Sequence, residues 1–253
     1  MQFKVVIPAR YASVRLPGKP LLELAGKPMI QHVYERALES GANEIVIATD
    51  NQQIADACRG FSADVCMTSA AHRSGSDRIA EVVSSRGWAD HEIIVNLQGD
   101  EPCMPPELLL QVAGDMDSHE PAAVTTLSSP ITDRNTLFDP HVVKVITDQQ
   151  GYALYFSRAP VPWHRDEFLN SDSPLPSDTG FARHIGLYAY RSGYLARYVA
   201  LNRAPIEQAE ALEQLRVLWH GDKIHVSEAS IEPGHGVDTE ADLSRVSELL
   251  SQR

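Results

Sequence analysis

VVIPARYASVRLPGK, which runs from Val5 to Lys19, joins an apolar segment directly to a basic loop. Its first five residues are continuously apolar, which is typical of a strand buried on both faces of a sheet. Arg10, Arg15, Gly18 and Lys19 then follow within ten residues. In open α/β sheets ligands bind beyond the carboxyl ends of the strands, so this junction predicts a site for an anionic ligand.

Around this junction, the first half of the chain alternates between strand and helix patterns. Strand patterns cover Glu44–Thr49, Val65–Thr68 and Ile93–Leu97, and helix patterns cover Pro28–Ser40, Gln52–Arg59 and Ser76–Ser85. Strands and helices that alternate over such short spans imply right-handed crossovers and a mostly parallel central sheet. The sequence therefore predicts an α/β fold with its chemistry in the loops after Ala9 and Leu97.

The second half of the chain has a different pattern. Asp148-Gln149-Gln150-Gly151 is a hairpin turn signal between the strand patterns Val142–Thr147 and Tyr152–Ser157. The remaining expected elements are a surface loop at Asp166–Thr179, a strand at Ile185–Tyr190, a helix at Ala209–Trp219, and a final helix through Leu250 that a capping box of Thr239 and Asp242 opens. We expect one domain that carries an inserted, partly antiparallel lobe.

Bulk composition narrows the class of protein. The formal net charge is −12 and no Lys/Arg stripe is present, which opposes nucleic-acid binding. Three cysteines without metal-type spacing fit a reduced compartment. The apolar run at the N-terminus is too short for a signal peptide, and no segment approaches the roughly 20 apolar residues of a membrane helix. We therefore expect a cytoplasmic protein with no membrane insertion.

The basic loop from Arg10 to Lys19 is suited to a triphosphate, because it combines distributed positive charge with a glycine that permits close backbone approach. It is not a P-loop, since Ser13 stands where a glycine is required and Pro20 follows Lys19. Taken alone, the loop is equally compatible with a solvated basic segment.

Two acidic motifs are suited to a hard cation. Asp100 lies in Asn96-Leu-Gln-Gly-Asp-Glu-Pro102, just beyond a strand, where a carboxylate could hold Mg²⁺ together with substrate phosphates. Asp238 lies in Gly234-His-Gly-Val-Asp-Thr239, just before a helix, and could supply a second ligand. Without further context, the first motif could be an ordinary acidic turn, and Asp238 could simply complement the helix dipole.

Smaller candidates lie between these motifs. Ser74-Gly-Ser76-Asp-Arg78 precedes and opens a predicted helix, and Arg158 ends a predicted strand. His184 and Tyr188 share one face of a strand, because both numbers are even. Glu213 and Gln214 lie on one predicted helix. Each of these residues, considered alone, could be structural.

Taken together, the motifs resemble those of the 3-deoxy-manno-octulosonate cytidylyltransferases. The matching segments are Ile7–Leu21, Ser74–Arg78, Asn96–Pro102, Gly151–Arg158, Leu212–Arg216 and Gly236–Thr239, in the family's order and over nearly the whole chain. Val14 and Ser76 stand where the family often has Thr, and neither change removes a charge. The resemblance implies a nucleotide-diphospho-sugar transferase-like fold, Mg²⁺ as cofactor and a homodimer.

The resemblance also implies roles for individual residues. It places Arg10 and Lys19 on the CTP phosphates, with Ser13 and Arg15 supporting the same CTP-binding loop. It places Ser76 and Arg78 on the cytidine, and Asp100 and Asp238 on magnesium. It places Gln98, Arg158, His184, Tyr188, Glu213 and Gln214 around the sugar. Within a single domain of residues 1–253, it implies a nucleotide-binding half at about 1–130, a sugar-binding and dimerisation lobe at about 131–230, and a return to the metal site at about 231–253.

The activity implied is transfer of CMP from CTP to 3-deoxy-D-manno-octulosonate (Kdo), with release of pyrophosphate, for lipopolysaccharide biosynthesis. The sequence leaves two alternatives open. One is the same reaction on the 8-amino analogue or another acid sugar, and the other is a catalytically silent nucleotide-binding module. A silent module would tolerate the loss of Asp100 or Asp238, and both are present.

Overall fold

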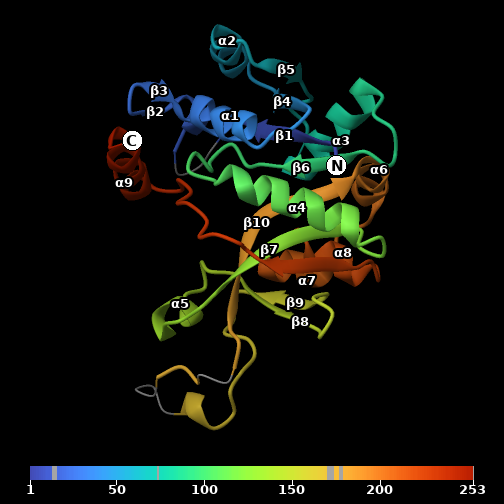
Figure 1. Cartoon of the computed structure of the whole chain (residues 1–253), viewed down its shortest axis with the longest axis vertical. Helices are drawn as coiled ribbons and strands as arrows, with labels where there is room; N and C mark the ends of the chain where they lie inside the picture. Colours follow the sequence, from blue (N-terminus) through green and yellow to red (C-terminus); the bar gives the residue numbers. More distant parts are fainter. Residues whose placement is uncertain (13–15, 73, 170–173, 177–178, 253) are drawn as a thin grey trace.

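A central mixed β-sheet forms the core of the molecule (Figure 1). In this computed structural model, which describes residues 1–12, 16–72, 74–169, 174–176 and 179–252, the described residues form a sheet of nine strands. Seven of the strands follow the order β11-β7-β10-β6-β1-β4-β5, and β8 and β9 extend the sheet from β10. None of the helices in the described part of the chain is long and apolar enough to cross a bilayer.

The parallel part of the sheet contains the strands that the sequence predicts. It is formed by β1 (Phe3–Ala9), β4 (Glu44–Thr49), β5 (Asp64–Met67) and β6 (Ile93–Asn96), with β1 between β4 and β6. β11 (Ile224–Glu228) is parallel to β7 (Val124–Pro130) at the other end of the sheet. The mostly parallel central sheet is therefore confirmed.

β10 (Ala182–Arg191) runs antiparallel to both of its neighbours, β6 and β7. It also pairs with β8 (Lys144–Thr147), which forms an antiparallel hairpin with β9 (Ala153–Ser157). Gly151 closes that hairpin with a φ of 82°, a left-handed conformation that glycine adopts without strain. The predicted hairpin is confirmed, and it continues the central sheet.

Helices cover both faces of the sheet, and the side chains of β1 point alternately to one face and to the other. Phe3, Val5, Ile7 and Ala9 pack with α1 (Met29–Glu39), α2 (Gln52–Gly60) and α4 (Pro106–Ser118). Val6 faces the opposite core, which contains α3 (Gly75–Arg86), α6 (Ser192–Ala200) and α8 (Leu215–Trp219). This alternation has the period of two that a pleated strand imposes.

Shorter elements surround this core. They are η1 (Lys19–Leu21), the ribbon of β2 (Glu23–Leu24) and β3 (Lys27–Pro28), α5 (Arg134–Phe138), η2 (Glu167–Leu169), α7 (Pro205–Glu210) and α9 (Glu240–Ser251). α5, β8 and β9 lie at one end of the sheet, far from α9 (Figure 1). α9 begins with the predicted capping box of Thr239 and Asp242 and buries Val246. The loop expected at Asp166–Thr179 contains η2, and part of it lies outside the described residues.

One predicted helix is wrong. The chain does not form a continuous helix over Ala209–Trp219, because α7 ends at Glu210 and α8 begins at Leu215. Ala211 between them has a φ of 52°, in the left-handed region that interrupts a right-handed helix. Apolar periodicity continues across the break, so the sequence pattern did not reveal it.

His184 lies on β10 beside a register shift between Ile185 and Tyr188. Its Nε2 lies 3.0 Å from Thr126 Oγ1, and its ring meets the Phe156 ring edge to face. The Thr126 hydroxyl donates to backbone carbonyls of β10, so its oxygen accepts a hydrogen bond from the Nε2–H group of a neutral His184 ring. Burial lowers the pKa of His184 to about 3.

This burial predicts a specific pH dependence of stability. Because the folded state keeps His184 neutral and the unfolded chain protonates it near pH 6.5, the free energy of unfolding falls as the pH drops below about 6.5. When the pH is lowered from 7 to 5, the free energy of unfolding measured by urea titration should fall by about 1–2 kcal/mol less in the His184→Gln variant than in the parent chain. The same substitution at the exposed His91 serves as the control. Equal losses in the parent and the His184 variant would contradict the burial argument.

Candidate active site

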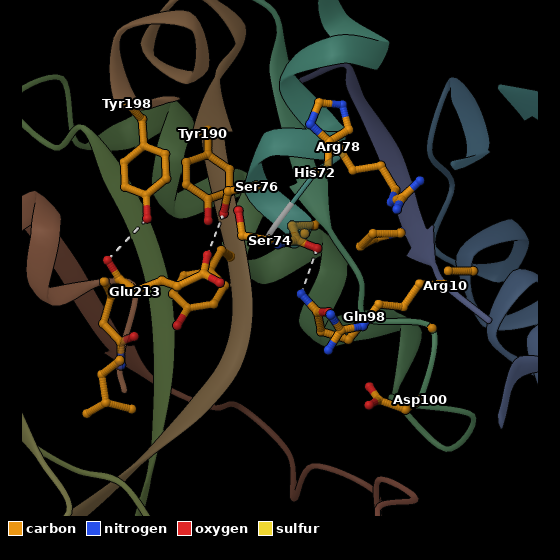
Figure 2. A pocket seen from close by; sticks show the side chains of 18 of the residues that line it. Arg10, His72, Ser74, Ser76, Arg78, Gln98, Asp100, Tyr190, Tyr198 and Glu213 are labelled. Atoms are coloured by element: carbon orange, nitrogen blue, oxygen red, sulfur yellow. Dashed lines mark hydrogen bonds between the residues drawn. The ribbon is translucent and has the colours of Figure 1, made fainter. Parts of the chain in front are cut away.

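A cavity of about 600 Å³ opens at the carboxyl ends of β1 and β6, the edge that the sequence predicts (Figure 2). This volume lies within the usual range for small-molecule sites. Residues from widely separated parts of the chain line the cavity: Pro8–Arg10 and Lys19–Pro20; His72, Ser74–Ser76 and Arg78; Asn96 and Gln98–Asp100; Val124; Tyr188, Tyr190 and Tyr198; Ala211–Gln214 and Val217; and Asp238.

The two aspartates of the acidic motifs converge on one cation. Lys19 Nζ lies 2.7 Å from Asp100 Oδ2 and 3.0 Å from Asp238 Oδ1. The three residues come from η1, from the turn after β6 and from the segment before α9. Two carboxylate oxygens directed at one point within 3.0 Å form a donor set that suits a hard divalent cation, since Mg²⁺ takes one or two carboxylates plus substrate oxygens. Asp100 and Asp238 could therefore hold a metal ion.

Close backbone packing brings the acidic turn to the end of β1. A Cβ atom on Gly99 would lie 2.9 Å from the carbonyl oxygen of Pro8, so a larger residue would push the turn away from β1. The Val237 amide donates to Asp100 O at 2.9 Å and joins the C-terminal segment to the same turn. Glu101, the next residue, is half-buried in this region, and its removal from water together with the nearby Asp100 and Asp238 raises its pKa to about 8.

The N-terminus of α3 forms a second wall of the cavity. Ser74 caps the helix by accepting from the Asp77 amide, and Ser76 Oγ donates to Glu213 Oε2 at 3.3 Å. The buried Arg78 guanidinium donates to Thr68 Oγ1 and to Asp50 Oδ2, the latter at 3.0 Å. Arg78 is therefore held rigidly at the cavity wall by the loops that follow β4 and β5.

Aromatic and acidic groups form the inner wall, opposite Arg10 and Asp100 in Figure 2. The Tyr188 and Tyr190 rings stack with their centroids 6.1 Å apart, and Tyr198 OH donates to Glu213 O at 3.2 Å. Burial raises the pKa of Glu213 and of all three tyrosines. A substrate rich in hydroxyl groups would meet hydroxyl and carboxylate partners here.

The break between α7 and α8 explains how Glu213 and Gln214 both face the cavity. Neighbouring residues on a continuous helix diverge by about 100°, so they cannot share a face. The turn after Ala211 removes that restriction. Gln214 Nε2 is buried and has no hydrogen-bond partner among the described residues. A buried amide donor without a partner is costly, which points to an acceptor on a ligand.

The structure brings most of the predicted site residues together. Ten of them line the cavity: Arg10, Lys19, Ser76, Arg78, Gln98, Asp100, Tyr188, Glu213, Gln214 and Asp238. Ser13 and Arg15 lie outside the described residues. His184 is not part of the cavity lining, although its ring lies 5.4 Å from that of Tyr188. Arg158 also lies elsewhere, with its Nε donating to Glu210 O and its Nη1 to Pro140 O.

Several lining residues were not among the predicted site residues. The polar and aromatic ones are His72, Ser74, Asn96, Tyr190 and Tyr198, of which Ser74 and Asn96 belong to the quoted motifs. Tyr190 could have been found by extending the even-numbered face of β10 from Tyr188, because side chains alternate along a strand. His72, which contacts Glu81, and the helical Tyr198 have no comparable local signal, because their positions depend on tertiary packing.

Comparisons with known proteins agree with this geometry. The chain matches the family described as cytidylyltransferase over residues 4–224. It is 53% identical to the 3-deoxy-manno-octulosonate cytidylyltransferase of Nitrosococcus oceani, with 99% of this chain and 97% of that protein aligned. Identity to the protein of the same name from Halorhodospira halophila is 54%, with 98% and 96% aligned.

A solved structure extends the likeness to three dimensions. The fold matches that of a CMP:2-keto-3-deoxy-manno-octonic acid synthetase in complex with CTP, with a TM-score of 0.90 and 41% identity. The match covers 100% of this chain and 99% of that one. Identity above 50% over nearly the full length of both proteins is decisive. The chain belongs to the 3-deoxy-manno-octulosonate cytidylyltransferase family.

Proposed function

We propose that this protein transfers CMP from CTP to Kdo, releases pyrophosphate and thereby supplies activated Kdo for lipopolysaccharide biosynthesis. The observation that carries the proposal is the convergence of Asp100 and Asp238 on Lys19 at a cavity of about 600 Å³. The names of the relatives, and the CTP bound in the similar solved structure, support the choice of substrates.

The reaction brings together two anions, the sugar carboxylate and the triphosphate. Two unit charges 4 Å apart repel by about 4 kcal/mol at an effective dielectric constant near 20. The protein itself has a formal charge of −12, so only cations inside the cavity can offset this repulsion. Arg10 and Lys19 stand at the cavity wall where the chain leaves β1. They bind the phosphates and stabilise the charge that develops on the departing pyrophosphate.

Mg²⁺ is the proposed cofactor, held by Asp100 and Asp238. The fit rests on the two carboxylate oxygens that already converge on one cation. When bound, Mg²⁺ neutralises phosphate charge and lowers the pKa of the attacking hydroxyl. Lys19 contacts both aspartates in this structure, so its ammonium group leaves them for the phosphates as CTP and the metal ion bind.

The chemical step is an in-line displacement at the α-phosphorus of CTP. The anomeric 2-hydroxyl of Kdo gives its proton to solvent water and forms the new P–O bond, while the bond from the α-phosphorus to the bridging oxygen breaks and pyrophosphate leaves. No covalent bond to the protein forms, so positioning and electrostatic stabilisation supply the catalysis. Ser76 and Arg78 hold the cytidine at the N-terminus of α3.

The sugar lies against the inner wall. Gln98, Tyr188 and Glu213 offer hydrogen-bond partners to its hydroxyl groups, and the buried Gln214 amide donates to one of its oxygens. Arg158 and His184 lie outside the cavity lining, so neither contacts the sugar directly from its present position, although the His184 ring contacts that of Tyr188. Both assignments to the sugar site stay predictions.

We also propose a homodimer in the cytoplasm. Trp163, Leu154 and Leu169 are 55%, 60% and 81% exposed around the β8–β9 hairpin and η2, and a second copy of the chain would cover them. Cys58 and Cys66 are not joined by disulfide bonds, which suits a reducing compartment. Sedimentation equilibrium should give about twice the monomer mass of 27.9 kDa, and a monomer mass at micromolar concentration would contradict the dimer.

The direct test of function is pyrophosphate release from CTP and Mg²⁺ across a panel of acid sugars. Kdo should support turnover, and Asp100→Asn should reduce it by roughly 1,000-fold without unfolding the protein, because one metal-binding charge is lost. Circular dichroism checks the fold of the variant. Release with the 8-amino analogue alone would transfer the assignment to that sugar, and no release with any sugar would favour a silent nucleotide-binding module.

Gln214→Met tests the sugar wall. The substitution keeps the side-chain length but removes the amide donor, so the KM for Kdo should rise about tenfold while the KM for CTP changes little. Thermal stability should not fall, because Gln214 Nε2 makes no hydrogen bond among the described residues.

Gln111→Met is the matched control for this variant. Gln111 bonds Glu228 O and the Ser230 amide outside the cavity, so its replacement should lower stability and leave both KM values unchanged. An unchanged KM for Kdo in the Gln214 variant would remove Gln214 from the sugar site.

A further inference from the structure

The segment before α9 lies directly on the turn that carries Asp100. The Val237 amide donates to Asp100 O at 2.9 Å, and this hydrogen bond joins the segment around residues 234–238 to the turn at 100–104. Asp238 follows immediately, which places its carboxylate opposite that of Asp100. The distance between the two aspartates therefore depends on how closely these two segments approach each other.

Two glycines stand at the points of closest approach. A Cβ atom on Gly234 would lie 2.6 Å from both the carbonyl carbon and the Cβ of Cys103, and closer still to the carbonyl oxygen of Cys103. A Cβ atom on Gly236 would lie 2.8 Å from Glu101 Oε1. Non-bonded carbon atoms settle near 3.5–4.0 Å, so neither position has room for a side chain.

Lack of space for a side chain, and not an unusual backbone conformation, explains why glycine occupies both positions. Neither Gly234 nor Gly236 has a positive φ, so an alanine could adopt either backbone. The two contacts also differ in kind. Gly234 faces the backbone of Cys103, which cannot move alone, whereas Gly236 faces the end of the Glu101 side chain.

The residues on either side prevent the segment from moving away freely. Val237 is buried with Met29, Cys103 and Val246 in a small apolar cluster. On the other side, the capping box of Thr239 and Asp242 fixes the start of α9. A side chain added at Gly234 must therefore separate the Asp238 segment from the Asp100 turn locally, by about 1 Å if normal contact distances are restored.

We propose that Gly234 and Gly236 are positioning residues that set the separation of Asp100 and Asp238, and thus the affinity of this site for a divalent cation in the presence of CTP. This inference rests on the proposed function of the two aspartates. Neither glycine needs to touch a substrate, and neither lines the cavity. Their contribution is the close contact between two segments that are distant in the sequence.

Gly234→Ala is the first test. A shift of about 1 Å in a reacting group costs up to about 100-fold in rate, so kcat should fall by about that factor. The Mn²⁺ concentration that gives half-maximal CTP binding, measured by equilibrium dialysis without the sugar, should rise at least about tenfold by the same displacement. Gly114→Ala is the matched control, because a Cβ there meets nothing within 4 Å. Its kcat and Mn²⁺ requirement should equal those of the parent chain.

Gly236→Ala provides a rescue experiment that a general loss of stability would not mimic. Glu101→Ala removes the atoms that a Cβ on Gly236 would meet, so the double variant should regain the Mn²⁺ requirement of Glu101→Ala alone. Adding Glu101→Ala to Gly234→Ala should rescue nothing, since the obstacle there is backbone. If Gly234→Ala does not fold, as circular dichroism would show, the Gly236 arm decides the question.

The outcomes separate this inference from the proposed function. Parent-like Mn²⁺ requirement and kcat in Gly234→Ala, or no rescue of Gly236→Ala by Glu101→Ala, would overturn the positioning role. Asp100→Asn measured in the same dialysis assay tests the metal site itself. If Asp100→Asn keeps the parent Mn²⁺ requirement, the metal assignment fails independently of the glycines.

Discussion

The pairing of one ammonium group with two carboxylates organises this site. Lys19 Nζ lies within 3.0 Å of oxygen atoms from both Asp100 and Asp238, which belong to opposite parts of the sequence. Two carboxylates held this close repel each other unless a cation lies between them. The protein supplies that cation from the basic loop, so the basic loop and the acidic pair form one electrostatic unit. Its position at the carboxyl ends of β1 and β6 follows from the parallel part of the sheet.

Other elements of the fold form the cavity wall that is proposed for the sugar, beside Lys19, Asp100 and Asp238. β10 crosses the sheet antiparallel between β6 and β7 and carries Tyr188 and Tyr190 to the cavity. The interruption between α7 and α8 adds Glu213 and Gln214 to the same wall. The part of the cavity proposed for the phosphates therefore comes from the regular α/β half, whereas the wall proposed for the sugar comes from departures from regular structure.

This division also decides what could be predicted from the sequence. The strand pattern predicts Glu44–Thr49 with the boundaries that the structure shows. The resemblance of the motifs predicts that Lys19, Asp100 and Asp238 belong to one site, and the three side chains converge. Periodicity did not reveal the break at Ala211, because a single left-handed residue leaves the apolar pattern intact. The face shared by His184 and Tyr188 was inferred from alternation, and the register shift between Ile185 and Tyr188 interrupts that alternation. Gly234 begins the acidic motif that contains Asp238, but its contact with Cys103 is long-range and has no local signal.

The central claim is that Asp100 and Asp238 exchange a lysine for a divalent cation when the nucleotide binds. Anomalous scattering from crystals grown with CTP and Mn²⁺ measures this directly. We expect a manganese peak in contact with a carboxylate oxygen of each aspartate, with Lys19 Nζ moved to the phosphates. A peak bound by phosphates alone or by other side chains, with Lys19 still bridging the two aspartates, would contradict it.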